Sequence, residues 1–334
     1  MDEFERVRGR LFGIAYRMTG AASEAEEVLQ DAWVRWAEVD RGAVRDPGAY
    51  LARVVTNLSI KRLTSARARR EVYVGEWLPE PVLTGRVEFD ALGPLEIVAE
   101  RESVSFALLV LLERLTPAER AAYVLREAFE YGHREVAELI GTSEANARQL
   151  VSRARKRLTA EHLEGVAGQS SEQAGQAVVR GLGEGRRPAE RAGGAGRRVV
   201  DRVRWRKLVE GFLAAARLGE VERLEELLAA DVVSRADGGG KVIAARNPVF
   251  GRERVARYLI GVLERFGAGI EPYFAEANGE PVLVAAGADG VVAICFISIE
   301  DEQITGLRLA MNPDKLTFAA AQLSQIGGLP DLSS

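Results

Sequence analysis

The sequence predicts a multidomain chain in which two all-α domains precede an α+β domain. Three observations predict this arrangement. Apolar residues recur at helical spacing through most of residues 4–160, a Gly- and Arg-rich stretch over residues 165–200 has little periodicity, and strand-like apolar runs separated by turn dipeptides follow. A chain of 334 residues is also long enough for about two or three domains.

The composition excludes several classes of protein. The 45 Lys and Arg residues against 49 Asp and Glu leave a net charge of −4, which gives no sign of a nucleic-acid partner. One Cys and two His cannot form an internal disulfide or a Cys/His zinc site, so we predict no metal and no cofactor. The apolar runs are too short to cross a bilayer and no secretory signal is seen, so we expect a cytoplasmic protein without a membrane partner.

Two amphipathic helices open the first domain, which is predicted over residues 1–74. The second helix is expected to begin at Ser23, because Ser23 and Glu26 have the spacing of a capping box. Its apolar stripe includes Trp33 and Trp36, which we expect to be buried. Its opposite face is polar and acidic, and this pattern alone is equally typical of a solvated surface; the residues are Glu24, Glu27, Gln30 and Asp31.

The third helix, beginning near Pro47, carries a basic stripe. Residues 53–70 contain six basic residues and no acidic one, a pattern typical of a helix that binds phosphates. Because a face that serves only solubility normally mixes both signs, we favour DNA binding. Asn57 is spaced four residues from its basic neighbours and is a candidate base reader. The predicted DNA-binding residues here are Arg53, Asn57, Lys61 and Arg62.

A helix-turn-helix pattern fills the second all-α domain, predicted over residues 104–163. Thr116 and Glu119 form a strong helix start with the spacing of a capping box. The chain then breaks at residues 131–133, and a short helix ends at Gly141.

The longer helix that follows this turn is predicted to enter the major groove. Residues 143–158 hold five basic residues and one acidic residue, which favours a recognition helix over an ordinary αα-hairpin. Its candidate DNA-binding residues are Asn146, Arg148, Gln149, Ser152, Arg153 and Lys156.

Two segments without clear periodicity separate the domains. Residues 75–103 form a predicted acidic connector with seven acidic and two basic residues, which we expect to avoid DNA. Within it, Pro79 and Pro81 stiffen the chain beside Trp77, a large aromatic anchor. Residues 164–200 form a predicted flexible linker.

The third domain is predicted over residues 201–318, with a C-terminal tail over residues 319–334. Asn278-Gly279 and Asp289-Gly290 have the composition of hairpin turns. The three glycines over residues 238–240 exceed what a two-residue turn needs, which indicates close approach of another backbone or, alternatively, a flexible hairpin. Strands are expected at residues 231–235, 242–245, 270–277, 281–286, 291–299 and 304–311, the fifth of them containing a buried Cys295.

Two basic helical units joined by an acidic connector resemble the extracytoplasmic-function group of bacterial RNA polymerase sigma factors. Residues 4–73 are similar to region 2 of that family and residues 104–160 to region 4. The resemblance implies core RNA polymerase and promoter DNA as partners. It implies that the Asn57 helix and the loop over residues 38–47 read and open the minus-ten element, and that residues 146–156 read the minus-thirty-five element. The polymerase would then be contacted by Glu27, Gln30 and Asp31.

Residues 77–81, 237–241 and 312–315 are similar to motifs of a subgroup of that family with a fused SnoaL-like C-terminal domain. This resemblance implies an α+β cone with a pocket, which could hold an unknown small ligand, and a domain that replaces a separate anti-sigma protein. The residues assigned to this interdomain regulation are Trp77, Pro79, Pro81, Asp237, Gly238, Gly239, Gly240, Lys241, Asn312, Pro313, Asp314 and Lys315.

Two other functions compete with this interpretation. A conventional helix-turn-helix regulator with a ligand-sensing domain would leave the basic third helix and the acidic second helix unexplained. A fused SnoaL-like enzyme is weakened because no His follows residue 162, although Asp231, Asp237 or Tyr273 could act as acids if the fold brought them together. We therefore predict a sigma factor that is not an enzyme.

Overall fold

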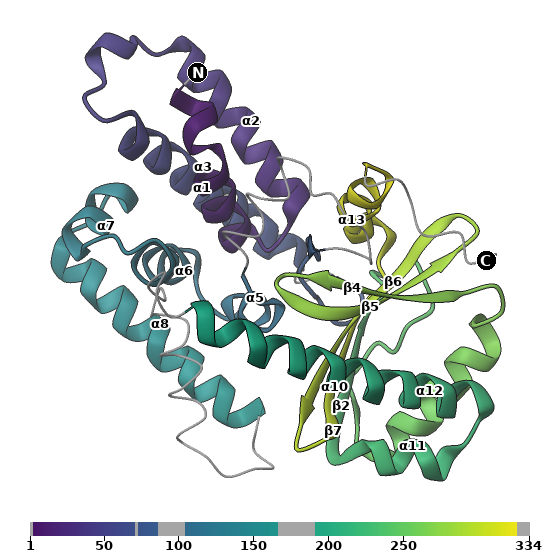
Figure 1. The fold of residues 1–334 in the computed structure, drawn as a ribbon. Helices are drawn as coiled ribbons and strands as arrows, with labels where there is room; N and C mark the ends of the chain where they lie inside the picture. Colours follow the sequence, from purple (N-terminus) through teal and green to yellow (C-terminus); the bar gives the residue numbers. More distant parts are fainter. Residues whose placement is uncertain (1–2, 71–72, 86–103, 166–190, 326–334) are drawn as a thin grey trace. The chain divides into compact units, whose positions relative to one another are not determined.

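The computed structural model divides the chain into two compact units (Figure 1). The first unit takes residues 1–72 and 101–185, and the second takes residues 73–100 and 186–334. The start of the predicted connector therefore belongs to the C-terminal unit. No helix in the described part of the chain combines the length and apolarity needed to cross a bilayer. The structure describes residues 3–70, 73–85, 104–165 and 191–325.

The N-terminal half of the first unit is a three-helix arrangement in which α1 packs against both α2 and α3. The buried stripes of these helices supply its core, as the helical spacing predicts. A short 3-10 turn, η1, is closed by the carboxylate of Asp40, which accepts the N–H of Gly42 at 3.1 Å. The elements are α1 (Glu3–Thr19), α2 (Ala22–Glu38), η1 (Arg41–Ala43) and α3 (Pro47–Arg70).

The start and the stripe of α2 differ from the prediction. The helix begins before Ser23 and no side chain caps it, so the capping box predicted there is wrong. Instead the Thr19 hydroxyl accepts the N–H of Ala21 at 3.3 Å and stabilises the turn between the helices. Trp36 is buried as predicted, but Trp33 is 50% exposed.

The other half of the first unit contains the helix-turn-helix. The capping box at Thr116 is confirmed, because the Glu119 N–H donates to the Thr116 hydroxyl at 3.3 Å and the Thr116 N–H donates back to the Glu119 carboxylate at 3.1 Å. Gly141 ends α7 with φ of 71°, a left-handed conformation that favours glycine. The elements are α5 (Phe106–Leu112), α6 (Pro117–Tyr123), the π-helical turn η2 (Val124–Ala128), α7 (His133–Ile140) and α8 (Glu144–Gly165).

A seven-stranded mixed sheet organises the C-terminal unit, in the order β1-β4-β5-β6-β7-β2-β3. Only the β2–β7 pair is parallel among the described strands. The strands are β1 (Leu83–Gly85), β2 (Leu228–Asp237), β3 (Val249–Phe250), β4 (Glu271–Ala277), β5 (Glu280–Gly287), β6 (Gly290–Glu300) and β7 (Gln303–Ala310). The helices are α10 (Arg191–Leu218), α11 (Val221–Leu227), α12 (Arg252–Phe266) and α13 (Pro313–Gln325).

Several boundaries in this unit differ from the prediction. Residues 242–245 are a bend followed by irregular chain rather than a strand, whereas the Asn278-Gly279 hairpin is present with both residues at positive φ. Helix α10 begins at Arg191, inside the predicted linker, and α13 runs to Gln325, inside the predicted tail. Residues 164–165 of the predicted linker end α8, and residues 166–190 and 326–334 lie outside the described residues.

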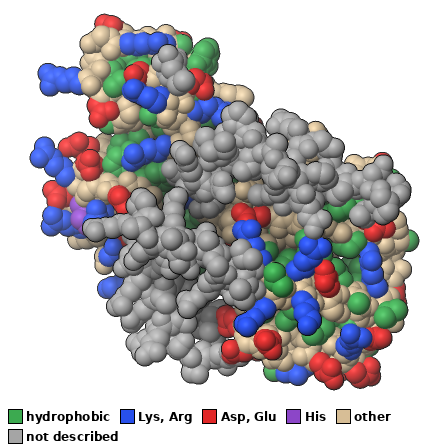
Figure 2. Space-filling model, in the orientation of Figure 1, with side chains coloured by type: hydrophobic (Ala, Val, Ile, Leu, Met, Phe, Trp, Pro, Cys, Tyr) green, Lys and Arg blue, Asp and Glu red, His purple; other side chains and the backbone are tan. Residues whose placement is uncertain are grey.

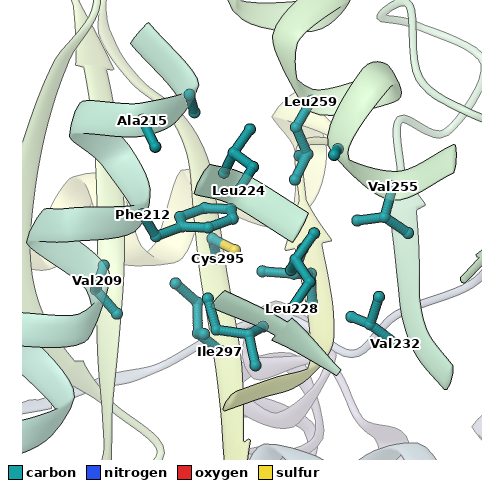
Figure 3. Packing of buried hydrophobic residues seen from close by; sticks show 14 of the residues in the cluster. Val209, Phe212, Ala215, Leu224, Leu228, Val232, Val255, Leu259, Cys295 and Ile297 are labelled. Carbon is teal, nitrogen blue, oxygen red and sulfur yellow. The ribbon is translucent and has the colours of Figure 1, made fainter. Parts of the chain in front are cut away.

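The two faces of the sheet have different coverings. Helices α10, α11 and α12 supply one face with an apolar core in which Phe212, Leu224 and Cys295 pack together (Figure 3). The opposite face carries Asp237 and is contacted by α13 and by residues 73–85, which we call the strap. This second face holds most of the motifs that the sequence singles out.

Candidate functional sites

The basic stripe predicted on α3 is present, but its members differ in environment. Arg53 and Lys61 are exposed. Asn57 is also exposed, and its amide approaches the carbonyl of Leu139 in α7 at 3.5 Å, a marginal hydrogen bond. Helix α7 therefore packs beside the predicted base reader within the first unit.

Arg62 is held by the acidic face of α2. Its guanidinium forms ion pairs with Glu27 and, at 3.1 Å, with Asp31. Burial lowers the pKa of Arg62, but hydrogen bonds to the two carboxylates raise that pKa overall. A predicted DNA-binding residue and two predicted polymerase-binding residues thus occupy one cluster, while Gln30 stays exposed beside them.

Helix α8 presents a continuous polar face. Arg148 forms an ion pair with Glu144, and the Asn146 amide donates to the Thr142 hydroxyl at 2.8 Å. The remaining four candidates lie at i, i+3, i+4 and i+7 and are exposed, with no ion pair or side-chain hydrogen bond to the described residues; they are Gln149, Ser152, Arg153 and Lys156.

Arg120 of α6 is buried against the end of α1. The residue is 1% exposed, its Nε donates to the carbonyl of Arg17 at 2.8 Å, and its Nη1 donates to Glu113 at 3.0 Å. Its Nη2 has no acceptor among the described residues. Burial lowers the pKa of Arg120 to about 9, which leaves the guanidinium charged at neutral pH. A charged side chain therefore anchors the second helical domain on the first.

Two further arginines extend this contact. The guanidinium of Arg10 lies 4.9 Å from the ring centroid of Tyr131, and that of Arg17 lies 5.2 Å from the centroid of Phe129. Arg10 also donates to the Phe129 carbonyl at 3.4 Å. Such cation–π contacts contribute about 0.5–2 kcal/mol each, depending on solvent exposure.

The strap is hydrogen-bonded into the C-terminal unit along its length. Val82 exchanges two hydrogen bonds with Asn278, at 3.1 and 2.8 Å, and Leu83 exchanges two with Gln322 of α13, at 2.9 and 3.1 Å. Strand β1 then pairs with β4 at the sheet edge. Leu78 is fully buried, and Pro79 and Pro81 are also buried.

Asp237 and Lys315 form the centre of this face. Lys315 Nζ lies 2.6 Å from Asp237 Oδ2 and donates to the Leu78 carbonyl at 2.6 Å; it also lies 3.2 Å from the ring centroid of Trp77. Asp237 also accepts the Leu78 N–H at 2.8 Å and the Tyr73 hydroxyl at 2.5 Å. Burial and the Asp237 carboxylate raise the pKa of Tyr73, so its hydroxyl remains a donor.

The glycine triplet lies against this cluster. A Cβ on Gly239, which has φ of 60°, would lie 2.3 Å from the Asn312 amide and 3.0 Å from the Tyr73 hydroxyl. A Cβ on Gly240 would lie 3.1 Å from Val74. The triplet is closely approached, but by side chains of the strap and Asn312 rather than by the other backbone that was predicted. Beside it, Lys241 pairs with Asp314 at 2.6 Å, and Pro313 begins α13.

Sequence reasoning missed Arg120, Tyr73 and Gln322. Arg120 sits in the last turn of a short helix, where an arginine normally faces water, and only the tertiary contact with α1 shows its burial. Tyr73 lies four residues before Trp77, with ring centroids 4.7 Å apart, but a single aromatic pair is a weak signal. Gln322 falls in the segment predicted to be a tail.

The three acids considered for catalysis do not converge. Asp231 is exposed, and Asp237 is already occupied by Lys315 and the strap. Tyr273 lies on β4, four strands from Asp237 in the sheet order. The helix-covered face is lined by apolar side chains (Figure 3). Within the described residues, no group of three or more His, Cys, Asp or Glu side chains could hold a metal ion.

Comparisons with known proteins support the two helical domains and the order of the whole chain. The chain matches the family models Sigma-70 region 2 over residues 4–69 and Sigma-70, region 4 over residues 105–158. It is 38% identical over 326 residues to the ECF RNA polymerase sigma factor SigJ of Mycobacterium tuberculosis, covering 95% of this chain and 93% of that relative. It is 26% identical over 320 residues to the probable ECF RNA polymerase sigma factor SigI of the same species, covering 95% and 94%. The crystal structure of M. tuberculosis SigJ matches with a TM-score of 0.67 and 34% identity, covering 95% of this chain and 98% of that one.

Proposed function

The chain belongs to the extracytoplasmic-function RNA polymerase sigma factors, and from this premise we propose which of its elements bind the polymerase, which read the promoter and which regulate initiation. As a sigma factor it acts with core RNA polymerase and promoter DNA. We place it in the cytoplasm with that polymerase. The proposal assigns polymerase binding to α2, promoter reading to α3 and α8, and regulation to the strap and its motifs.

The observation that carries the promoter assignment is the face of α8. Gln149, Ser152, Arg153 and Lys156 are free of partners among the described residues and share one side of the helix that follows the turn. Arg155 and Arg157, by contrast, pair with Glu127 and Glu119. The helix thus presents a mixed hydrogen-bonding and basic face, which suits base edges flanked by phosphates.

The polymerase assignment is supported by the surface of α2. Glu27, Gln30 and Asp31 are exposed, and the 50% exposed indole of Trp33 lies next to them along the helix. An acidic face with an apolar aromatic suits a basic partner surface that also buries an anchor.

The packing of the first unit implies that it must open on a promoter. Elements centred near minus ten and minus thirty-five lie about 25 base pairs apart, or roughly 85 Å at 3.4 Å per base pair. A compact unit of this size is only about 40 Å across. The contact between Arg120 and α1 must therefore break before α3 and α8 read both elements.

Regulation is assigned to the strap because three separate motifs meet there. Trp77, Asp237 and Lys315 come from distant parts of the sequence and share one buried ion-pair cluster. The strap is also the chain's route out of the first helical domain. A change that loosens the strap would alter how the C-terminal unit holds the segment that leads from one promoter-reading domain to the other.

We propose no catalytic role and no ligand in the helix-covered core of the C-terminal unit. Its apolar side chains supply neither an acid nor a base, and Cys295 is buried, with burial raising the pKa of its thiol to about 12. Figure 2 shows basic and acidic side chains interleaved over the visible surface of this unit.

An in vitro transcription assay with core polymerase tests the promoter assignment. Arg153→Ala should weaken minus-thirty-five recognition by about 1–3 kcal/mol and relax its base preference, whereas Arg157→Ala, which loses only a partly exposed ion pair, should leave preference unchanged. A uniform loss for Arg153→Ala on all sequences would mark a phosphate contact instead. Absence of initiation with both the full chain and Gly239→Val, which loosens the strap, would contradict the functional division itself.

A further inference from the structure

A pair of arginines on the strap face is incompletely neutralised. Arg235 of β2 and Arg308 of β7 are register partners on parallel neighbouring strands, so their side chains leave the sheet on the same side. That side is the one that carries Asp237, two residues along β2. Nothing in the promoter or polymerase assignments uses these two guanidinium groups.

The two arginines differ in their partners. Arg235 pairs with Glu76 of the strap, at 3.3 Å, and both side chains are partly exposed. Arg308 donates from Nη1 to the hydroxyl of Ser298 at 3.2 Å, while its buried Nε has no acceptor in the part of the chain that the structure describes. No carboxylate among the described residues lies within ion-pair distance of Arg308.

This arrangement contrasts with the other cations of the strap face. Lys315 has Asp237 at 2.6 Å, and Lys241 has Asp314 at 2.6 Å, so each has a carboxylate of its own. At Arg308, burial and then the neighbouring Arg235 lower the pKa, and the carboxylate of Glu280, which forms no ion pair with Arg308, offsets this only in part. A half-buried guanidinium with a free N–H beside a second guanidinium is the arrangement that binds carboxylate or phosphate oxygens.

We propose that Arg235 and Arg308 form a binding site for a small carboxylate- or phosphate-bearing anion, and that this anion competes with Glu76 for Arg235. The anion would accept from the free Nε of Arg308 and from Arg235. Because Glu76 belongs to the strap, anion binding removes one of the ion pairs that hold the strap on the sheet. The site therefore links a small metabolite to the segment to which we assign regulation, although binding itself does not depend on that assignment.

Calorimetric titration of the full chain with inorganic phosphate at constant ionic strength tests the site, and succinate in a second titration distinguishes carboxylate from phosphate recognition. Arg308→Met should weaken binding at least about tenfold, since it removes a charge-assisted donor. Glu76→Gln should strengthen it about threefold by removing the competitor. Lys241→Met, a matched loss of charge at an exposed pair on the same unit, should leave the affinity unchanged.

A second measurement keeps the test independent of folding effects. Arg308→Lys retains the charge but loses the Nε–H, so it should bind more weakly than the native chain while unfolding at the same temperature. Hydrogen exchange at the Leu78 and Val82 amides, which bond to Asp237 and Asn278, should accelerate when phosphate binds. The proposal is overturned if neither anion binds Glu76→Gln below about 10 mM, or if Arg308→Met and Lys241→Met bind equally well.

Discussion

Two cations are buried, Arg120 in the helical unit and Lys315 in the C-terminal unit. The protein compensates their charges to different degrees. Lys315 is 4% exposed and has a fully buried carboxylate, a carbonyl and an aromatic ring around its ammonium group. Arg120 is 1% exposed, but Glu113 is still 13% exposed at its side chain, and Nη2 of Arg120 has no acceptor among the described residues.

The difference indicates which contact is built to separate. Removing a cation from water is offset only where charges and hydrogen bonds replace hydration. Around Lys315, charges and hydrogen bonds do replace the lost hydration. Releasing the strap would break these interactions, and water would have to hydrate both Asp237 and Lys315 instead. Around Arg120 the lost hydration is replaced only in part, so the guanidinium gains hydration when the two helical domains move apart. We infer that the contact at Arg120 opens more readily than the one at Lys315.

The largest expected effect is at Asp237. Asp237→Ala leaves the Lys315 ammonium buried without its carboxylate, and should lower the free energy of unfolding by about 3–5 kcal/mol in urea denaturation of the full chain. Asp314→Ala removes the exposed partner of Lys241 and should cost less than about 1 kcal/mol. Adding Lys315→Met to Asp237→Ala should recover most of the loss. Equal losses for the two aspartate variants would remove the distinction between a buried and a surface pair.

Matched methionine substitutions compare the two cations directly. Lys315→Met leaves the carboxylate of Asp237 buried and should cost about 3 kcal/mol, whereas Arg120→Met leaves Glu113 near water and should cost only about 1 kcal/mol. Urea denaturation of both variants, followed by circular dichroism, measures the difference. If Arg120→Met is the more destabilising, the charge of Arg120 is well compensated, and the contact at Arg120 does not open more readily than the one at Lys315.

The sequence was informative where a pattern is local and less so where burial depends on tertiary contact. The helix-turn-helix, the capping box at Thr116 and the Asn278-Gly279 hairpin follow from short-range rules, and the structure contains all three. The strap could not be recognised as part of the sheet, because β1 is only three residues long and its partner strand lies almost 200 positions away. The pairing of Arg62 with Glu27 and Asp31 could not be predicted either, because it joins the basic stripe of α3 to the acidic face of α2, and the two were predicted separately.

Cys295, a neutral buried group in the same unit as Lys315, should make the free energy of unfolding depend on pH. Burial raises the pKa of Cys295 from 9.0 to about 12, so the folded chain keeps the thiol proton after the unfolded chain has lost it. The stabilising contribution is complete below pH 9 and falls as the pH rises toward 12. Between pH 9 and pH 10 the loss should be about 1 kcal/mol. Cys295→Ala should show a smaller loss over the same interval; an unchanged loss would assign it to other groups.

The smallest expected effect concerns Arg62, a cation that is more exposed than Arg120 and Lys315. Glu27→Gln should remove one of the two ion pairs of Arg62, leaving the pair with Asp31, and raise the affinity of the chain alone for promoter DNA by up to about threefold, because surface ion pairs contribute at most about 1 kcal/mol. Fluorescence anisotropy at several salt concentrations should show a steeper salt dependence, by about one further phosphate contact.

Glu38→Gln is the matched control, since Glu38 is exposed on the same helix and the substitution changes the charge equally. It should raise DNA affinity less than Glu27→Gln does, and combining Glu27→Gln with Arg62→Met should abolish the gain. If Glu38→Gln raises the affinity as much, the effect is one of net charge, and Glu27 does not mask Arg62. If the gain is specific, a polymerase that engages both Glu27 and Asp31 would release Arg62 at the same moment, so that binding of core enzyme and binding of DNA reinforce each other.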